Sequence, residues 1–323
     1  MAISLWSFHG SDGFLRVGSE GMDEVLRSGQ AYWLDLEIAD LPSLLPHQAL
    51  LPGHPLNWED AGKPTQRPKL EEHGDHLFLV MRGLDSAQHR LAEQLHTLQL
   101  ACFLTSSSLI TIRSGPMTSV DGVRARMEKG LLSFKAEPDG VLHAILDDLV
   151  DGYGPHVEEW ETEMDRLLRE AMDRPRQLIM GRILSIRKHM LLLRRLAFGQ
   201  REILSLLARE RDGLIQPHWR PYFRDVLDHL TSLVEASETL RDSVSIAVDV
   251  YLNSVNNRLS EVMKILTVIS SVMLPLTLVT GIYGMNFDRI PGLHHPWAFF
   301  FVIGGMLVLA TGMLVFFKRS RWL

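Results

Sequence analysis

One face of the apolar segment around residues 265–283 carries side chains that could line a path for ions. Its members recur at steps of three and four residues, which places them on one side of a helix. They are Met263, Leu266, Ser270, Leu274, Thr277 and Gly281. In several copies around an axis, the polar positions would turn hydroxyls or backbone inward, and the larger side chains would form apolar constrictions that can gate by dewetting. Small residues also suit ordinary packing between membrane helices, so the sequence leaves both interpretations open.

Residues typical of an enzyme active site are not visible elsewhere in the sequence. The 323 residues contain no H-E-x-x-H, no G-x-S-x-G, no glycine-rich phosphate loop and no Cys–His nucleophile pair in a convincing context. The single cysteine, Cys102, excludes an internal disulfide framework and a cysteine-cluster metal site. With 33 basic and 39 acidic side chains, the net charge of −6 argues against a nucleic-acid partner. We expect no catalytic residue and no cofactor; a membrane-tethered enzyme built on residues 1–140 stays as an alternative that a hydrolase screen tests.

Two apolar stretches near the C-terminus are each long enough to cross a membrane. They cover residues 265–283 and 297–317, about 20 residues each, which is the length that roughly 30 Å of hydrocarbon requires. The only charged side chains between residues 265 and 317 are Asp288 and Arg289, in the connecting loop. A buried helical hairpin of a large soluble core is the alternative. The insertion costs of charged residues favour two transmembrane helices, in contact with membrane lipid.

Basic residues at the outer ends of these two stretches predict their orientation. Lys264 precedes the first, and Lys318, Arg319 and Arg321 follow the second, whereas the loop at residues 284–296 has no net charge. Because basic flanks stay on the cytoplasmic side, both termini are expected in the cytoplasm of a multi-pass protein of the inner (plasma) membrane. The N-terminal segment has neither the basic region nor the apolar core of a signal peptide.

The cytoplasmic part changes character near residue 140. Residues 1–140 read as an α/β domain, with short β-like runs at residues 31–36, 76–81, 99–104 and 108–112 and a Pro/Gly-rich loop at residues 54–69. Residues 141–264 read as a helical bundle and stalk, with helices at about 139–172, 175–211 and 221–283. Residues 265–323 form the third domain, which is the transmembrane hairpin with its outer loop and basic cytoplasmic tail.

The third helical segment carries a coiled-coil seam that leads into the first apolar stretch. Apolar or small residues recur there at steps of three or four with one stutter. They are Val226, Leu230, Leu233, Ser237, Leu240, Val244, Ala247, Tyr251, Val255, Leu259, Val262 and Leu266. A continuous helix of this length would measure roughly 90 Å. No 260-residue domain needs such a rod at its core, so pairing with copies of itself predicts a parallel, symmetric oligomer.

The end of the first apolar stretch resembles the signature of the CorA family of two-span divalent-cation channels. It reads Tyr283, Gly284, Met285, Asn286 and Phe287, and the family signature is Gly-Met-Asn after the first span. The likeness continues in segments of the stalk (residues 221–226, 249–252, 261–264 and 273–277) and in the basic tail (residues 317–323). It covers about 100 C-terminal residues strongly and is patchier in the N-terminal domain.

The resemblance implies a CorA-like funnel-shaped homopentamer with an α/β cytoplasmic domain, a long helical stalk and two transmembrane helices per subunit. It implies a selectivity filter formed by Gly284, Met285 and Asn286, with five copies of Asn286 in an outer ring. Since Mg²⁺ sheds water reluctantly, a ring of neutral amide oxygens suits its hydrated form. Ser260 stands where the family often has Asn in the pore-facing stalk, and is a further pore-lining position. The partners are therefore other copies of the chain and divalent cations.

The resemblance leaves the transported ion and its regulation open. In the family, cytoplasmic metal between neighbouring subunits holds the pore shut; Asp225 matches one of the carboxylates of that site, and Asp85 is the candidate for its partner. The outer loop carries His294 and His295, which could favour Zn²⁺, Ni²⁺ or Co²⁺ over Mg²⁺. The alternatives are a zinc-preferring, ZntB-like transporter and a membrane-anchored regulatory protein that kept the fold and lost transport.

Overall fold

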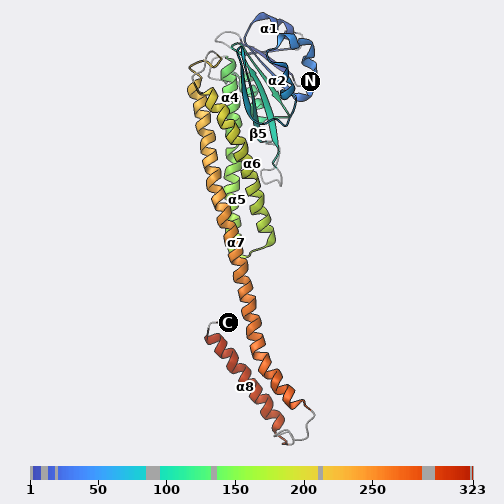
Figure 1. Cartoon of the computed structure of the whole chain (residues 1–323), viewed down its shortest axis with the longest axis vertical. Coiled ribbons are helices and arrows are strands. Elements are labelled where there is room, and N and C mark those ends of the chain that lie inside the picture. The colour runs from blue at the N-terminus through green and yellow to red at the C-terminus, as the bar shows by residue number, and fades with distance from the viewer. Residues whose placement is uncertain are drawn as a thin grey trace. The chain divides into compact units, whose positions relative to one another are not determined.

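The chain divides into two compact units in the computed structural model (Figure 1). The structure describes residues 3–8, 14–18, 21–84, 95–131, 137–209, 214–285, 295–320 and 322. Unit 1 consists of Met1–Arg169 and Gln177–Val248, and unit 2 consists of Glu170–Arg176 and Asp249–Leu323. One helix, α7 (Arg220–Tyr283), passes from the first unit into the second.

Unit 1 contains a seven-stranded sheet with the strand order β2-β1-β3-β7-β6-β5-β4. The strands are β1 (Ser4–Phe8), β2 (Phe14–Val17), β3 (Tyr32–Glu37), β4 (Lys69–His73), β5 (His76–Leu84), β6 (Thr97–Leu104) and β7 (Ser108–Arg113). Only β3 and β7 pair in parallel; the other neighbours are antiparallel. Four of these strands confirm the β-like runs of the sequence. The runs for β1, β2 and β4 were not predicted, and β4 in particular is polar, with the sequence KLEEH.

Helices cover both faces of this sheet, which explains the continuously apolar sequence of β5 (Figure 1). On one face, α1 (Met22–Ser28), the 3-10 helix η2 (Ile38–Leu50) and α2 (Pro55–Ala61) share a core with Phe78 and Phe103. On the other face, α4 (Pro138–Asp151) packs on β3 and β7, and α6 (Gln177–Leu207) packs on β4 and β5. A further helix, α3 (Thr118–Glu128), lies against α4. A strand between two helical layers must be apolar on both sides, because both sets of its side chains leave water.

Two sequence expectations about local structure are wrong. Residues 54–69 are not a loop throughout, because α2 begins in them at Pro55, with the His54 ring accepting a hydrogen bond from the Leu56 amide (3.3 Å). The helix expected at residues 139–172 is two helices, α4 and α5 (Gly154–Asp173). Pro155 has no N–H to donate to the carbonyl of Asp151, which ends α4 at that residue.

The break between α4 and α5 buries Tyr153, which joins the sheet to the helices. The Tyr153 hydroxyl donates to the backbone carbonyl of Arg82 on β5 and lies 3.1 Å from Oε1 of Gln200 on α6. The Gln200 amide donates to the same Arg82 carbonyl (2.7 Å). Both side chains are fully buried. Satisfied polar groups of this kind fix the position of packed elements, because an alternative position would leave them without partners.

A second buried polar network lies at the parallel pair β3–β7. The Trp33 indole donates to the Thr111 hydroxyl (3.0 Å), which donates to Oδ1 of Asp35 (2.9 Å). The other carboxylate oxygen of Asp35 lies 3.3 Å from Nε of Arg113 and 3.7 Å from the guanidinium of Arg124. Asp35 is 0% exposed, and burial raises its pKa to about 6 despite these cations.

The seam of α7 is used differently in its two halves. Val226, Leu230, Leu240, Val244 and Ala247 are buried within the subunit. Ion pairs link this half of α7 to α6 (Arg194–Glu238, 3.4 Å) and to α4 (Asp151–His229, 3.4 Å). The expectation that the whole seam pairs between copies is therefore wrong for residues 226–247. From Val255 to Leu266 the seam side chains are exposed, so this part of α7 presents an apolar face that the rest of the subunit does not cover.

Candidate functional site: the α7 face and an acidic cluster

The face of α7 that the sequence predicts to line an ion path is exposed in unit 2. Ser270, Leu274, Thr277 and Gly281 line a groove of about 690 Å³ on this helix, together with Met285. The side chains that precede the groove on the same helix are exposed too, namely Ser260, Met263 and Leu266. Within the groove, Leu274 is 72% exposed. The structure therefore brings the residues singled out from the sequence onto one continuous, uncovered face. An apolar helix face of this length is unstable in water, so it needs a neighbouring helix or lipid.

The hydroxyl of Thr277 is oriented by its own helix. It donates its hydrogen to the Met273 carbonyl at 2.8 Å. The hydroxyl of Thr267 is bound to the Met263 carbonyl in the same way, also at 2.8 Å. A hydroxyl with its hydrogen engaged can only accept further hydrogen bonds. The Thr277 oxygen therefore presents lone pairs, which suit the water hydrogens of a hydrated cation.

The C-terminal end of α7 is built closely around Gly284. The Gly284 amide donates to the Thr280 carbonyl (2.8 Å) and the Met285 amide to the Ile282 carbonyl (3.3 Å), so helix-like hydrogen bonding continues for two residues beyond Tyr283. A Cβ at residue 284 would lie 3.0 Å from the Thr280 carbonyl oxygen, so glycine is needed for close approach to the preceding turn. Asn286, the third residue of the predicted filter, lies outside the described residues, as do Asp85 and His294.

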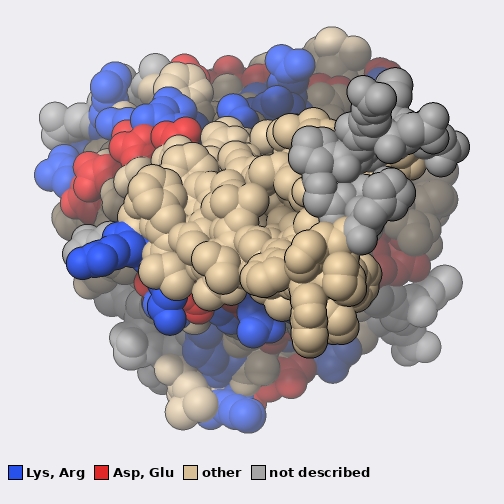
Figure 2. Space-filling view, turned by 90° about the horizontal axis from the view of Figure 1, so that it is seen from below, with Lys and Arg blue, Asp and Glu red and all other residues tan. Residues whose placement is uncertain are grey.

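Two helices of the described chain are long and apolar enough to cross a membrane. They are the C-terminal part of α7 and α8 (Ala298–Arg319), and almost none of either apolar stretch is buried within the chain. Figure 2 looks from the end at which these helices are joined, and uncharged residues fill the foreground of that view. Lys318 and Arg319 lie in the last turn of α8, as the orientation predicted from the sequence requires.

A group of potential metal ligands that the sequence analysis missed lies beside Asp225. Asp147 and Asp151 on α4 and His229 on α7 place three potential ligand atoms within 4.8 Å of one another. Nε2 of the same histidine lies 3.8 Å from a carboxylate oxygen of Asp225, one turn away on α7. Burial raises the pKa of Asp147, and the neighbouring charge of Asp151 raises it further. Carboxylates gathered in this way repel one another, and a bound divalent cation would relieve that repulsion.

A sequence signal for this cluster exists but is weak. Asp147 and Asp151 are four residues apart, and so are Asp225 and His229, so each pair shares one helix face. Nothing in the sequence indicates that these two faces meet. The packing of α4 against α7 brings them together.

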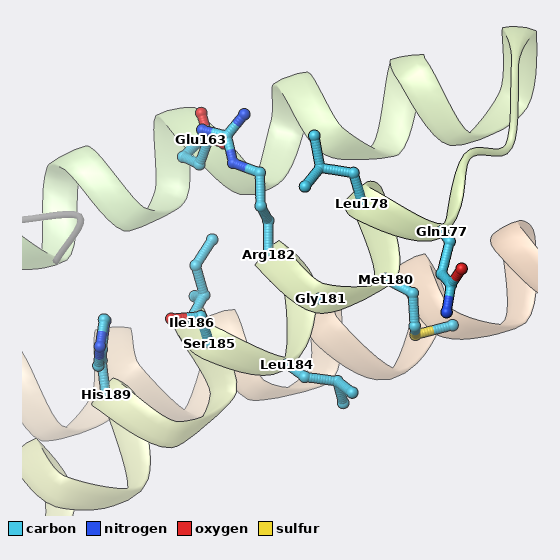
Figure 3. A pocket seen from close by; sticks show the side chains of 10 residues that line it. All are labelled: Glu163, Gln177, Leu178, Met180, Gly181, Arg182, Leu184, Ser185, Ile186 and His189. Carbon is cyan, nitrogen blue, oxygen red and sulfur yellow. Dashed lines mark ion pairs between the residues drawn. The ribbon is translucent and has the colours of Figure 1, made fainter. Parts of the chain in front are cut away.

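A separate groove of about 750 Å³ lies along α6 near the connection from α5 (Figure 3). Its walls are apolar side chains such as Leu178, Met180 and Ile186. Arg182 on α6 extends to Glu163 on α5 and forms an ion pair across it. Arg166 binds the same carboxylate with two hydrogen bonds of 3.0 Å. This groove is far in the sequence from the α7 face and contains no predicted site residue.

These features define the chain as a two-span membrane protein, with an exposed small-residue face on its first span and an α/β and helical domain ahead of it. A family comparison identifies the class further. The model of the family described as "CorA-like Mg2+ transporter protein" matches residues 28–319, and the chain belongs to this family. Its members transport metal cations and are not enzymes, so the chain is a divalent-cation transporter that needs no cofactor.

Individual relatives differ in the ion that their names give. "Cobalt/magnesium transport protein CorA" of Thermotoga maritima is 36% identical over 274 residues, which are 84% of this chain and 77% of the relative. "Zinc transport protein ZntB" of Yersinia pseudotuberculosis is 24% identical over 334 residues, covering 100% of this chain and 96% of the relative. The solved structure of the CorA magnesium transporter from Methanocaldococcus jannaschii superimposes with a TM-score of 0.84 at 21% identity, over 100% of this chain and 99% of that one. The fold is therefore that of CorA, while the ion is not decided by the fold.

Proposed function

We propose that five copies of the chain form a CorA-type channel that passes hydrated Mg²⁺ through an axial pore, with the Asn286 ring as its selectivity filter. The observation that carries this proposal is the exposed face of α7, on which Ser270, Thr277 and Gly281 line one groove together with Met285. Its apolar members are large enough to close a narrow pore by excluding water. Two helices do not surround a channel, so several copies of the chain are needed to enclose a path.

The transport direction and energy source follow from the cation's charge. Two charges that move through 100 mV gain about 4.6 kcal/mol, so a negative cytoplasm drives uptake without ATP. We place the α/β domain and both termini in the cytoplasm, since Lys264, Lys318 and Arg319 flank the spans on one side. The membrane is then the plasma membrane, which is the inner membrane of a two-membrane cell.

Mg²⁺ and Co²⁺ are the ions we favour, and Zn²⁺ is the alternative. The relative named for cobalt and magnesium is more similar in sequence (36%) than the relative named for zinc (24%). Met285 completes the Gly-Met-Asn signature, which the zinc branch commonly lacks. His295, at the start of the second span, is a ligand type that Zn²⁺ and Ni²⁺ prefer and Mg²⁺ does not.

The cluster of Asp147, Asp151 and His229 is the proposed cytoplasmic control site, with Asp225 beside it. A cation bound there would neutralise three carboxylates that otherwise repel one another. Because the site contains an imidazole, we expect it to bind Co²⁺ or Zn²⁺ more tightly than Mg²⁺.

The test is cation flux into proteoliposomes that contain the full-length protein. Asn286→Ala should change the ratio of Mg²⁺ to Co²⁺ flux, whereas Gln177→Ala, an exposed amide outside the spans, should leave it unchanged. Unchanged rate and selectivity in Asn286→Ala would show that the filter assignment is wrong. A pentamer that conducts no divalent cation at all would instead favour the regulatory protein that lost transport.

A further inference from the structure

The connection between α5 and α6 has the composition of a membrane-surface contact. Residues 170–176, which are the last residues of α5 and the connection to α6, are grouped with the stalk and the spans in unit 2 and not with the sheet-bearing unit. We call residues 169–178 the hairpin tip. Arg169, Arg174 and Arg176 are exposed in it. Two large apolar side chains are exposed as well, Met172 at 65% and Leu178 at 74%. Exposed apolar side chains between arginines are typical of segments that contact anionic lipid.

The charge of α5 reverses toward this tip. Residues 157–165 contain five acidic side chains and no basic one, whereas residues 166–188 contain seven basic and two acidic ones, a difference of 7 − 2 = +5. The whole chain has a net charge of −6, so this positive segment does not reflect the average composition. Arg166 and Arg182 are engaged with Glu163, which leaves the arginines nearer the turn free of that carboxylate. The segment is therefore electrostatically suited to a negative surface.

The position of the tip along α7 is compatible with contact to the membrane. Arg194 of α6 lies 3.4 Å from Glu238 of α7, and the two helices run in opposite directions (Figure 1). Arg176 is 18 residues before Arg194, so it falls beside residue 256 of α7. The first span begins nine residues later, about 14 Å away by the helix rise. The headgroup layer is roughly 5–8 Å thick, so the remaining gap is comparable to the Debye length of about 8 Å.

We propose that the hairpin tip docks on the anionic headgroups of the cytoplasmic leaflet, through Arg169, Arg174 and Arg176, with Met172 and Leu178 at the lipid surface. The proposal uses the membrane orientation proposed above and adds a third lipid-contacting element to the two spans. Each arginine near an anionic surface is expected to raise the docked population about five-fold. The docked tip would anchor the end of the α5–α6 hairpin independently of the pore.

The test uses the full-length protein in nanodiscs with a fluorescent label at Met172→Cys. Cys102 is fully buried and is the only native cysteine, so the introduced thiol is the one that reacts. Burial also raises the pKa of the Cys102 thiol, which suppresses its reactivity further. Quenching by nitroxide-headgroup lipid is compared between discs of neutral phosphatidylcholine and discs with 30% phosphatidylglycerol.

Quenching should be several-fold stronger in the anionic discs and should fall to the neutral value in 1 M salt. The double change Arg174→Gln and Arg176→Gln, which leaves Arg169 in place, should reduce the difference between the two lipids to less than half. The matched change Arg187→Gln and Lys188→Gln, two exposed basic residues about 17 Å farther along α6, should preserve it. Equal quenching of the wild-type chain in both lipids, or a lipid difference that the first double change leaves undiminished, would overturn the proposal. Cation flux of the same samples reports separately on the proposed channel function.

Discussion

Replacing Asp35 by asparagine should remove a pH dependence of stability that the sheet now has. The carboxyl is 0% exposed, and its pKa in the folded chain is about 6, against 3.8 for the ordinary group. A raised folded-state pKa means that the folded chain holds the proton more tightly than the unfolded chain. The stabilisation from this proton is fully present below pH 3.8 and is lost as the pH rises through 6.

The size of this effect follows from the two pKa values. The full difference between the two pKa values corresponds to about 3 kcal/mol, and somewhat less than half of it separates pH 5 from pH 7. The wild-type chain should therefore open its β3–β7 pair about ten-fold less often at pH 5 than at pH 7. In Asp35→Asn the side-chain oxygen can still accept from Thr111, so the hydrogen bond stays and only the titration disappears.

Hydrogen exchange with mass spectrometry on the full-length protein measures this difference. Amides of β3 and β7 are followed at pH 5 and pH 7, each rate being corrected for the pH dependence of intrinsic exchange. Subtracting the two free-energy changes, wild type minus Asp35→Asn, removes the contribution of all other titrating groups. Identical pH dependence in both proteins would refute the assignment of this effect to Asp35. If, relative to Asp35→Asn, the wild type became more stable from pH 5 to pH 7, the pKa of Asp35 would be lowered by folding and not raised.

Three further changes test other parts of the structure. Gly284→Ala places a Cβ 3.0 Å from the Thr280 carbonyl oxygen, and the strain of about 1 kcal/mol should lower cation flux about five-fold without disturbing assembly; an unchanged rate contradicts the role of glycine. Asp151→Asn should weaken equilibrium Co²⁺ binding at least ten-fold, whereas Asp242→Asn, an exposed acid elsewhere on α7, should not; equal affinities count against the control site. Tyr153→Phe should destabilise the chain by about 1–2 kcal/mol in denaturant unfolding, because it leaves the buried Gln200 amide with one partner fewer; a neutral result would mean that water replaces the hydroxyl.

The parts of the fold that the sequence predicts are those with long, uniform patterns. The two apolar stretches and α7 are confirmed as helices because their signals extend over about 20 residues or more. Strand β5 is confirmed because it contains five consecutive apolar residues, Leu77–Met81, as a strand buried on both faces requires. The polar strand β4 escapes the same reasoning, since its pairing with β5 depends on a neighbour and not on its own composition.

Features that depend on packing between distant segments were not predictable. The seam residues Val226 and Leu240 have the same spacing as Leu259, yet the first two are buried within the subunit and the third is 59% exposed. A heptad pattern specifies that a helix has a partner, but it does not specify which chain supplies it. The cluster of Asp147, Asp151 and His229 was missed for the same reason, because only the packing of α4 on α7 brings its groups together.

Because the helix α7 is continuous, a small rotation at one of its ends displaces the other end. Its 64 residues correspond to about 96 Å, and apart from Pro221 in the first turn the only proline within it is Pro275, in the membrane span. A tilt of about 5° at the Arg220 end of such a rod displaces the opposite end by about 8 Å. An angular change small enough to be absorbed by side-chain rearrangement at one end therefore becomes a movement wider than a helix turn at the other.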